Sequence, residues 1–406
     1  MKKKDKKIWI VGTGLGGMRL MTRQVSAVLK MARLFIGSSE VLETVRRYAS
    51  ENGARCVSAV RTAQVRRAVV EAEEERIVVL TAEDPATSAS ARDITLSLAD
   101  LSPVILPGVP VVSYAASRFG ITCPDAVYAD LTCSRPGIAA LCRQHEYVLI
   151  RTGVHTQEMF AQLMEAGLRD VQMMVLDRPA EEKERVLKGR LGEMAAAGLA
   201  GDTICLFIRA ASKGICGRTL TGRGGTGASV NSRRELPKEI RSAVLARLSL
   251  TAHDTVYVFG AGTGETAIEA AEQAALGTVY AFENREEELA QLRKNCAAQG
   301  AGNVQIITGN GLAMLNHLPS PDAVIVSGNP ESVIDLIQIC LSRNPDTGLV
   351  VVTHSFEKAT AAAAQMEAKQ LENEFLQITS CRAVSGKDGH EIAPGETAFI
   401  VSRIES

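Results

Sequence analysis

The stretch that decides the fold is Val256-Tyr-Val-Phe-Gly260-Ala-Gly262-Thr-Gly264-Glu265. Four apolar residues typical of a buried β-strand lead into a glycine turn, and the residues after it are typical of a helix. Glycines at such a turn let a ligand approach the backbone, and the helix N-terminus offers N–H groups without intrahelical partners. We therefore expect a strand, a ligand-binding loop and a helix, with Gly260, Gly262 and Gly264 in the loop.

A second apolar segment supports this interpretation. The strand predicted at 278–282 ends at Glu283, about 20 residues after the first glycine of the loop. An acid at that point can accept hydrogen bonds from both ribose hydroxyls of a nucleoside. The alternative is that the glycines only permit a tight turn. A nicotinamide dehydrogenase would have G-x-G-x-x-G, and Glu265 occupies the place of its last glycine, which disfavours that class.

The composition narrows the class of protein. A chain of 406 residues with 46% hydrophobic and 22% charged residues is long enough for two globular domains. A net charge of -1 excludes the broad basic field of a general nucleic-acid binder. The nine cysteines are scattered without C-x-x-C, so we expect reduced thiols in a cytoplasm and no zinc site. No apolar stretch approaches the length of a membrane span.

Short apolar runs alternate with helical stretches along the whole chain, which predicts an α/β fold with mainly parallel sheets. The predicted strands are Ile8–Val11, Leu34–Ile36, Ile77–Leu80, Val104–Leu106, Val148–Ile150, Ile204–Ile208, Val256–Phe259, Val279–Phe282, Val304–Ile307, Ala323–Val326 and Leu349–Val352.

The segment from Ser212 to Leu236 divides these strands into two sets. It is rich in Gly, Ser, Thr and Arg and has no periodicity, so it cannot build a core. Pro237 then starts a helix. We predict a first half at 1–212, a linker at 213–236 and a second half at 237–406. Alternatively, arginines of the linker contact an anionic substrate. These are Arg218, Arg223, Arg233 and Arg234.

The second half resembles the class I methyltransferases of cobalamin synthesis. The similar segments are LPKEIRSAVLARL, GAGTGETAIEAA, TVYAFENREEEL, AGNVQIITGN and LPSPDAVIV. The resemblance implies a Rossmann-like fold that binds S-adenosyl-L-methionine, with Asn310 near the adenine. It also implies methylation of C15 of a precorrin ring and decarboxylation of the C12 acetate. The chain departs from the family at Val258 and Asn310, where acids are usual.

The first half also carries a glycine pattern, with Gly12, Gly14 and Gly17 in G-x-G-x-x-G spacing after a predicted strand. The spacing alone suggests a dinucleotide site. The next predicted strand ends at Gly37 and not at an acid, so the ribose contact of such a site is missing. We therefore reject the dinucleotide interpretation.

The first half instead resembles the tetrapyrrole methylases, and among them the members that methylate C5. The similar segments are VGTGLGGMRLMTRQVSAVLKMARLFIGS, VVLTAEDP, ILPGVPVVSYAASRFG and EEKERVLKG. The resemblance implies two α/β sub-domains with the cofactor in a cleft between them. The cleft would be edged by Gly12, Gly14, Asp84, Pro107 and Gly108, and Thr152 would lie on the family's other cofactor loop.

Several loops of the first half depart from the family pattern. Leu15 replaces a usual proline, Gly17 an aspartate and Glu83 a glycine, while Pro110 begins a pair that replaces two serines. Residues 130–135 and 176–179 also differ. Glycines that admit a ligand are not freely replaced, so we expect the first half to bind the cofactor less well than the second.

Both resemblances, in this order along the chain, imply a fused C5,15-methyltransferase that uses S-adenosyl-L-methionine on an anionic precorrin or cobalt-precorrin. We expect a cytoplasmic homo-oligomer that binds no metal, nucleic acid or membrane. Positioning and electrostatics would supply the catalysis, and the sequence identifies no catalytic residue. Two alternatives remain: a class I methyltransferase acting on another substrate such as RNA, with a non-catalytic first half, or a non-enzymatic tetrapyrrole-binding protein.

Overall fold

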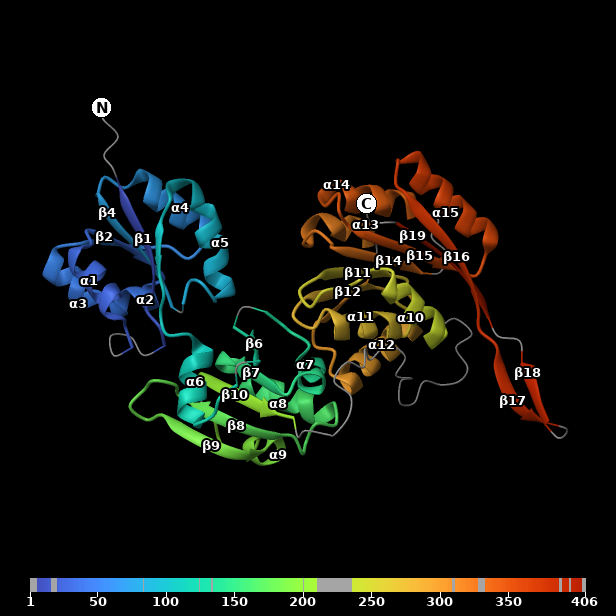
Figure 1. Cartoon of the computed structure of the whole chain (residues 1–406), viewed down its shortest axis with the longest axis horizontal. Coiled ribbons are helices and arrows are strands. Elements are labelled where there is room, and N and C mark those ends of the chain that lie inside the picture. The colour runs from blue at the N-terminus through green and yellow to red at the C-terminus, as the bar shows by residue number, and fades with distance from the viewer. Residues whose placement is uncertain are drawn as a thin grey trace.

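The computed structural model describes residues 6–15, 20–82, 84–123, 125–132, 134–199, 201–209, 236–308, 311–327, 333–386, 389–393 and 396–403. Three large sheets organise these residues, each covered by helices, and a two-stranded hairpin extends from the last one (Figure 1). The first two sheets belong to the first half of the chain and the third to the second half.

The first sheet forms one sub-domain of the first half. Its strand order is β3-β2-β4-β1-β5, and each of its pairings is parallel. The elements are β1 (Lys7–Gly12), α1 (Arg23–Met31), β2 (Leu34–Gly37), α2 (Ser39–Thr44), α3 (Arg46–Asn52), β3 (Arg55–Ser58), α4 (Thr62–Glu71), β4 (Arg76–Thr81), α5 (Ala89–Ser97), η2 (Ala99–Leu101) and β5 (Val104–Leu106).

The second sheet forms the other sub-domain, with the order β6-β7-β10-β8-β9. Only β6 and β7 pair in parallel, because β8 and β9 form a hairpin and β10 runs against both of its neighbours. Its elements are α6 (Val111–Phe119), β6 (Val127–Asp130), α7 (Ile138–Gln144), β7 (Tyr147–Arg151), η3 (Gly153–His155), α8 (Thr156–Glu165), β8 (Gln172–Asp177), β9 (Arg185–Arg190), α9 (Leu191–Met194) and β10 (Thr203–Ile208).

The third sheet has the order β13-β12-β11-β14-β15-β19-β16, parallel except at β19. The elements are α10 (Lys238–Ala246), β11 (Thr255–Phe259), α11 (Glu265–Gln273), β12 (Thr278–Phe282), α12 (Glu286–Gln299), β13 (Val304–Ile307), α13 (Gly311–Met314), η4 (Leu315–His317), β14 (Ala323–Ser327), α14 (Val333–Arg343), β15 (Gly348–Thr353), α15 (Phe356–Ala368), β16 (Asn373–Thr379), β17 (Arg382–Gly386), β18 (Gly389–Ala393) and β19 (Thr397–Arg403).

Strand β11 shows how this sheet divides the second half into two cores. Val256 and Val258 lie in the core shared with α10 and α11, whereas Tyr257 and Phe259 lie in the core on the opposite face. Side chains alternate between the faces of a strand, and helices cover both faces, so all four residues are apolar. The order of strands reverses direction at β11, since the chain goes from β11 to β12 and β13 on one side and to β14 and β15 on the other.

All eleven predicted strands are confirmed, and the prediction of mainly parallel sheets holds for the first and third sheets only. The sequence missed the edge strands β3 and β9, whose residues are mostly exposed and not continuously apolar. It also missed interior strands such as β8 and β19, whose residues are mostly buried. The mixed α/β architecture with two sub-domains followed by a Rossmann-like sheet is as expected.

The predicted linker lies almost wholly outside the described residues, as do Arg218, Arg223, Arg233 and Arg234. Its last residue, Leu236, is 8% exposed and belongs to the core of the second half. The boundaries of the halves otherwise remain a prediction.

Candidate functional site

The glycine loop of the second half connects β11 to α11 at the point where the strand order reverses. Gly260, Gly262 and Gly264 all have positive φ, of 70°, 58° and 95°. A Cβ on Gly260 would lie 2.4 Å from the Ser327 carbonyl oxygen, and one on Gly264 would lie 2.1 Å from Leu292 Cδ1. A Cβ on Gly262 would meet no atom within 4 Å, so the loop is open there. Packing and positive φ both require glycine at Gly260 and Gly264, whereas at Gly262 the positive φ alone favours glycine and the open space leaves room for a ligand.

Glu283 follows β12 and reaches this loop. Its Oε2 accepts a hydrogen bond from the Gly262 N–H at 2.8 Å, and its Oε1 accepts from the N–H groups of Asn284 at 2.9 Å and Arg285 at 3.0 Å. The predicted glycine loop and the predicted acid therefore meet, at the carboxyl ends of adjacent parallel strands. Ligands of open α/β sheets bind at this position.

The environment of Glu283 favours the ionised carboxylate. Burial alone would raise its pKa, but the hydrogen bonds from Arg285, Gly262 and Asn284 outweigh that effect, and the net pKa is lowered. The Arg285 guanidinium lies 3.3 Å from Glu283 and 3.2 Å from Glu288. The Arg285 guanidinium adds two longer hydrogen bonds to Glu283, at 3.3 and 3.5 Å, so the hydroxyl groups of a ribose would take the place of these two donors.

A buried ion cluster behind the glycine loop was missed by the sequence analysis. Arg241 of α10 is 4% exposed and lies 2.7 Å from the carboxylate of Glu265 and 2.8 Å from that of Glu269. It also donates to the carbonyl of Leu236 at 2.6 Å. Glu265 is the first residue of α11, directly after Gly264, so Arg241 fastens the start of the helix that follows the loop. The only sequence signal was an arginine at the end of Lys-Glu-Ile-Arg, next to the glycine motif.

Two further predicted positions in this half have different outcomes. Asn310 lies outside the described residues. Val258, which stands where the resembling family usually has an acid, is fully buried among apolar side chains of the core. An apolar residue therefore suits this position.

In the first half, the loops after β1 and β5 meet. A Cβ on Gly108 would lie 3.1 Å from the Gly12 carbonyl oxygen, and one on Gly14, whose φ is 68°, would lie 3.5 Å from the Val109 nitrogen. Pro107 directly follows β5, next to Gly108. These glycines bring two segments into backbone contact at one edge of a parallel sheet, and their place in a cofactor cleft stays a prediction.

Asp84 and Thr152, the other two predicted residues, are engaged in local structure. Asp84 is 5% exposed and accepts a hydrogen bond from the Ala86 N–H at 3.1 Å within a turn. Thr152 lies in the second sub-domain and is fully buried, and its hydroxyl contacts those of Thr156 at 2.7 Å and Thr203 at 2.5 Å. Its side chain is therefore part of a buried hydroxyl cluster.

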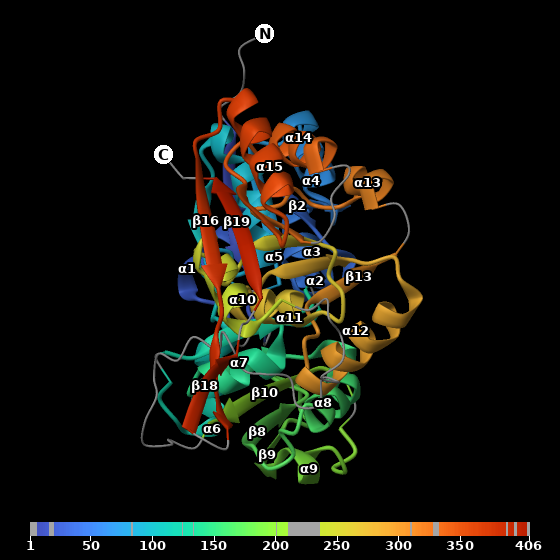
Figure 2. The same ribbon diagram turned by 90° about the vertical axis from the view of Figure 1, so that its right-hand side faces the viewer.

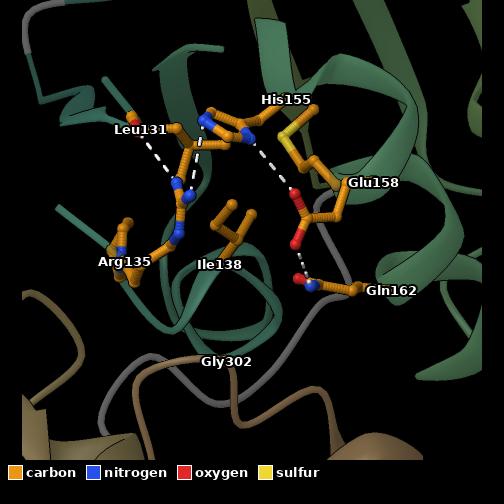
Figure 3. A pocket seen from close by; sticks show the side chains of 9 residues that line it. Leu131, Arg135, Ile138, His155, Glu158, Gln162 and Gly302 are labelled. Carbon is orange, nitrogen blue, oxygen red and sulfur yellow. Dashed lines mark hydrogen bonds and ion pairs between the residues drawn. The ribbon is translucent and has the colours of Figure 1, made fainter. Parts of the chain in front are cut away.

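A small pocket of about 30 Å³ lies beside the loops that follow β6 and β7 (Figure 3). His155 contacts Arg135 through Nε2 at 3.3 Å and Glu158 through Nδ1 at 3.1 Å. Gly302 of the second half also lines the pocket. The sequence analysis did not identify this pocket, because its residues come from segments far apart in the chain.

Within the described segments, we find no cluster of three or more His, Cys, Asp or Glu side chains suited to a metal. Across the same segments, every helix is too short or too polar to cross a bilayer.

The comparisons with known proteins agree with this geometry. Residues 7–195 match the family model of the Tetrapyrrole (Corrin/Porphyrin) Methylases, and residues 234–402 match that of the Precorrin methyltransferase domain. The precorrin-6Y C(5,15)-methyltransferase (decarboxylating) of Sinorhizobium sp is 22% identical over 79% of this chain and 78% of that protein. The cobalt-precorrin-6B C(15)-methyltransferase (decarboxylating) of Salmonella typhimurium is 27% identical over 40% of this chain and 85% of that protein.

Among solved structures, the C-terminal domain of precorrin-6Y C5,15-methyltransferase from Rhodobacter capsulatus aligns with 46% of this chain and 98% of that chain. The two are 20% identical, with a TM-score of 0.40.

The two family matches show a methyltransferase made of two different α/β modules. The chain belongs to the tetrapyrrole methylases in its first half and to the precorrin methyltransferase family in its second. It is an enzyme that transfers methyl groups and therefore uses a methyl donor.

Proposed function

We propose that this chain methylates C5 and C15 of a precorrin or cobalt-precorrin ring and decarboxylates the C12 acetate, with S-adenosyl-L-methionine as the methyl donor. The family matches of the two halves and the name of the Sinorhizobium relative support the substrate and the pair of positions. The second half would carry out the C15 step and the first half the C5 step. The cytoplasmic location and the homo-oligomer expected from the sequence remain predictions.

One observation carries the cofactor assignment. The Gly262 N–H and the Glu283 carboxylate lie 2.8 Å apart at the point where the strand order reverses, and the space beside Gly262 is open. A ribose can approach the backbone there, and its hydroxyls can donate to the ionised carboxylate. The residues of the second half therefore fit a nucleoside-bearing cofactor.

In this reaction the protein contributes the orientation of the reactants and electrostatic stabilisation. When bound, the sulfonium of S-adenosyl-L-methionine supplies an activated methyl group that an electron-rich ring carbon can accept. The glycine loop and Glu283 would hold the nucleoside so that its methyl group faces the ring. In the first half, Gly12, Gly14 and Gly108 would form one edge of a second cofactor cleft. Asp84 and Thr152 would stabilise the surrounding loops.

Calorimetric titration with S-adenosylhomocysteine tests the proposal. The full chain should bind two equivalents with different affinities, and Glu283→Ala should weaken the tighter one. Incubation of a corrin precursor with labelled cofactor should then place methyl groups on C5 and C15. No binding of S-adenosylhomocysteine to a folded chain would refute the proposal.

A further inference from the structure

The two halves contact each other directly through residues that the structure describes. α7 and α8 of the second sub-domain lie beside the C-terminal ends of α11 and α12 in both views (Figures 1 and 2). Ala275, just beyond α11, is 1% exposed and belongs to the hydrophobic cluster of the second sub-domain. The core of one half therefore includes a residue of the other.

The contact satisfies carbonyl groups at the end of α11. The last four carbonyls of a helix have no partner within the helix, so their burial requires donors from elsewhere. The side chain of Gln144 donates to the Glu272 carbonyl at 2.7 Å, and the Gly137 N–H donates to the Ala275 carbonyl at 2.8 Å. Both donors come from the first half and both acceptors from the second.

Arg143 joins the ends of two helices that belong to different halves. Its guanidinium donates to the Gln299 carbonyl, at the end of α12, at 2.9 Å and to the Ala166 carbonyl, at the end of α8, at 3.0 Å. It also lies 3.9 Å from the Glu272 carboxylate. Helix C-termini carry partial negative charge, so a cation between two of them is stabilised by both. A surface arginine paired with a single solvated partner would contribute little to stability.

Gly300 allows the helices to approach this closely. A Cβ at this position would lie 2.6 Å from Ala139 Cβ and 2.8 Å from Ala166 Cβ, both in the first half. Gly120, at the end of α6, has the same left-handed conformation, with φ of 67° against 66°, but a Cβ there would meet nothing within 4 Å. Gly300 therefore has two roles: it ends α12, and its lack of a side chain allows the first half to pack closely against it. Gly120 has only the first role, at the end of α6.

We propose that the α7–α8 surface is a specific docking site for the second half of the same chain, which stays bound without a covalent link. The interface comprises Gly137, Ala139, Arg143, Gln144 and Ala166 of the first half and Glu272, Ala275, Gln299 and Gly300 of the second. It fixes the two methyl-transfer modules relative to each other, whatever their substrates.

The test cleaves the folded full chain at a protease recognition sequence inserted within 213–236. After cleavage, the two wild-type pieces should elute together in size-exclusion chromatography at low micromolar concentration. Gly300→Ala should raise the dissociation constant of the pieces at least about tenfold, while Gly120→Ala, with the same backbone strain, should leave it unchanged. Gln144→Ala, which removes a contact made only with the other half, should weaken association without backbone strain.

Three outcomes would overturn the proposal. The first is that the wild-type pieces separate after cleavage. The second is that Gly120→Ala weakens their association as much as Gly300→Ala does. The third is that neither Gly300→Ala nor Gln144→Ala weakens it. Folding of each variant is checked before cleavage by circular dichroism. If Gly300→Ala fails to fold, Gln144→Ala decides the question. The readout is association alone, so it does not depend on which reaction the enzyme catalyses.

Discussion

The two halves each carry a glycine turn after their first strand, but they support it differently. In the second half an ionised carboxylate, Glu283, reaches the Gly262 N–H, and a buried ion cluster around Arg241 holds the start of the following helix. In the first half the loops after β1 and β5 contact each other through Gly12 and Gly108. The second site is therefore organised by charged side chains and the first by backbone packing.

This difference matters for a nucleoside cofactor. Charge-assisted hydrogen bonds to an ionised carboxylate are roughly twice as strong as those between neutral groups. The polar side chains predicted for the first site serve local structure, since Asp84 closes a turn and the Thr152 hydroxyl lies in a buried cluster. We therefore expect the second site to be formed before ligand binds and the first to depend more on its substrate.

The largest difference in stability between the two halves should come from the substitution of Arg241. Arg241→Met leaves the carboxylates of Glu265 and Glu269 buried without their cation, and breaking a buried pair in this way costs about 3–5 kcal/mol. The loss should be confined to the second half. The only tryptophan, Trp9, lies in β1, so its fluorescence reports unfolding of the first half. Calorimetry should show a lower melting temperature for the second half and an unchanged Trp9 transition.

A matched control is Arg66→Met in the first half. Arg66 makes a two-pronged pair with Asp100, but its side chain is 42% exposed, so solvent screens the interaction. Loss of the Arg66–Asp100 pair should change the stability of the first half little. Equal destabilisation by the two substitutions would contradict the distinction between the halves.

The sequence predicted which residues meet at the glycine loop of the second half better than the contacts in the first half, for a physical reason. Glycine spacing, strand ends and a strand-end acid are local features of parallel α/β units, so the meeting of Gly262 and Glu283 followed from the order of strands. The roles of Arg241, Arg143 and Gly300 depend on which helices pack together, and no local pattern encodes that. The burial of the Thr152 hydroxyl likewise depends on Thr203, which lies far along the chain on an antiparallel strand.

The second prediction concerns Glu283. Glu283→Ala should weaken binding of S-adenosylhomocysteine to the second half by about 1–3 kcal/mol, or about 5- to 150-fold. Since the pKa of Glu283 is lowered, the carboxylate stays ionised around neutral pH, and its contribution is lost only as the pH falls through that lowered value. Calorimetric titration at several pH values measures both effects.

Glu288→Ala is the control for this prediction. Glu288 contacts the same arginine, Arg285, at 3.2 Å, but among the residues that the structure describes we find no hydrogen bond from it to the glycine loop. Its removal should leave affinity nearly unchanged. Unchanged affinity in a folded Glu283→Ala variant would instead remove the ribose assignment.

The third prediction compares the two sites directly. The second site should bind S-adenosylhomocysteine at least about tenfold more tightly than the first, which corresponds to about one charge-assisted hydrogen bond. Pro110 contributes to the difference, because this N-cap residue directly before α6 has no backbone N–H to donate to a ligand. Labelled methylation of a corrin precursor should be faster at C15 than at C5. Efficient C5 methylation with a silent second site would reverse this ranking.

The smallest effect on stability should come from producing the two halves as separate chains. Each has cores of its own, around β1 and β4 in the first half and on both faces of β11 in the second, so residues 1–212 and 234–406 should each fold cooperatively. The second piece begins before Leu236, because the carbonyl of this residue accepts a hydrogen bond from Arg241.

Separation exposes only the docking surface and should lower each melting temperature by a few degrees, at about 2–4 °C per kcal/mol. Trp9 fluorescence and calorimetry measure the two melting temperatures. Aggregation of both pieces, with rescue only on co-expression, would show that the halves form one folding unit and that the predicted boundary is not a domain boundary.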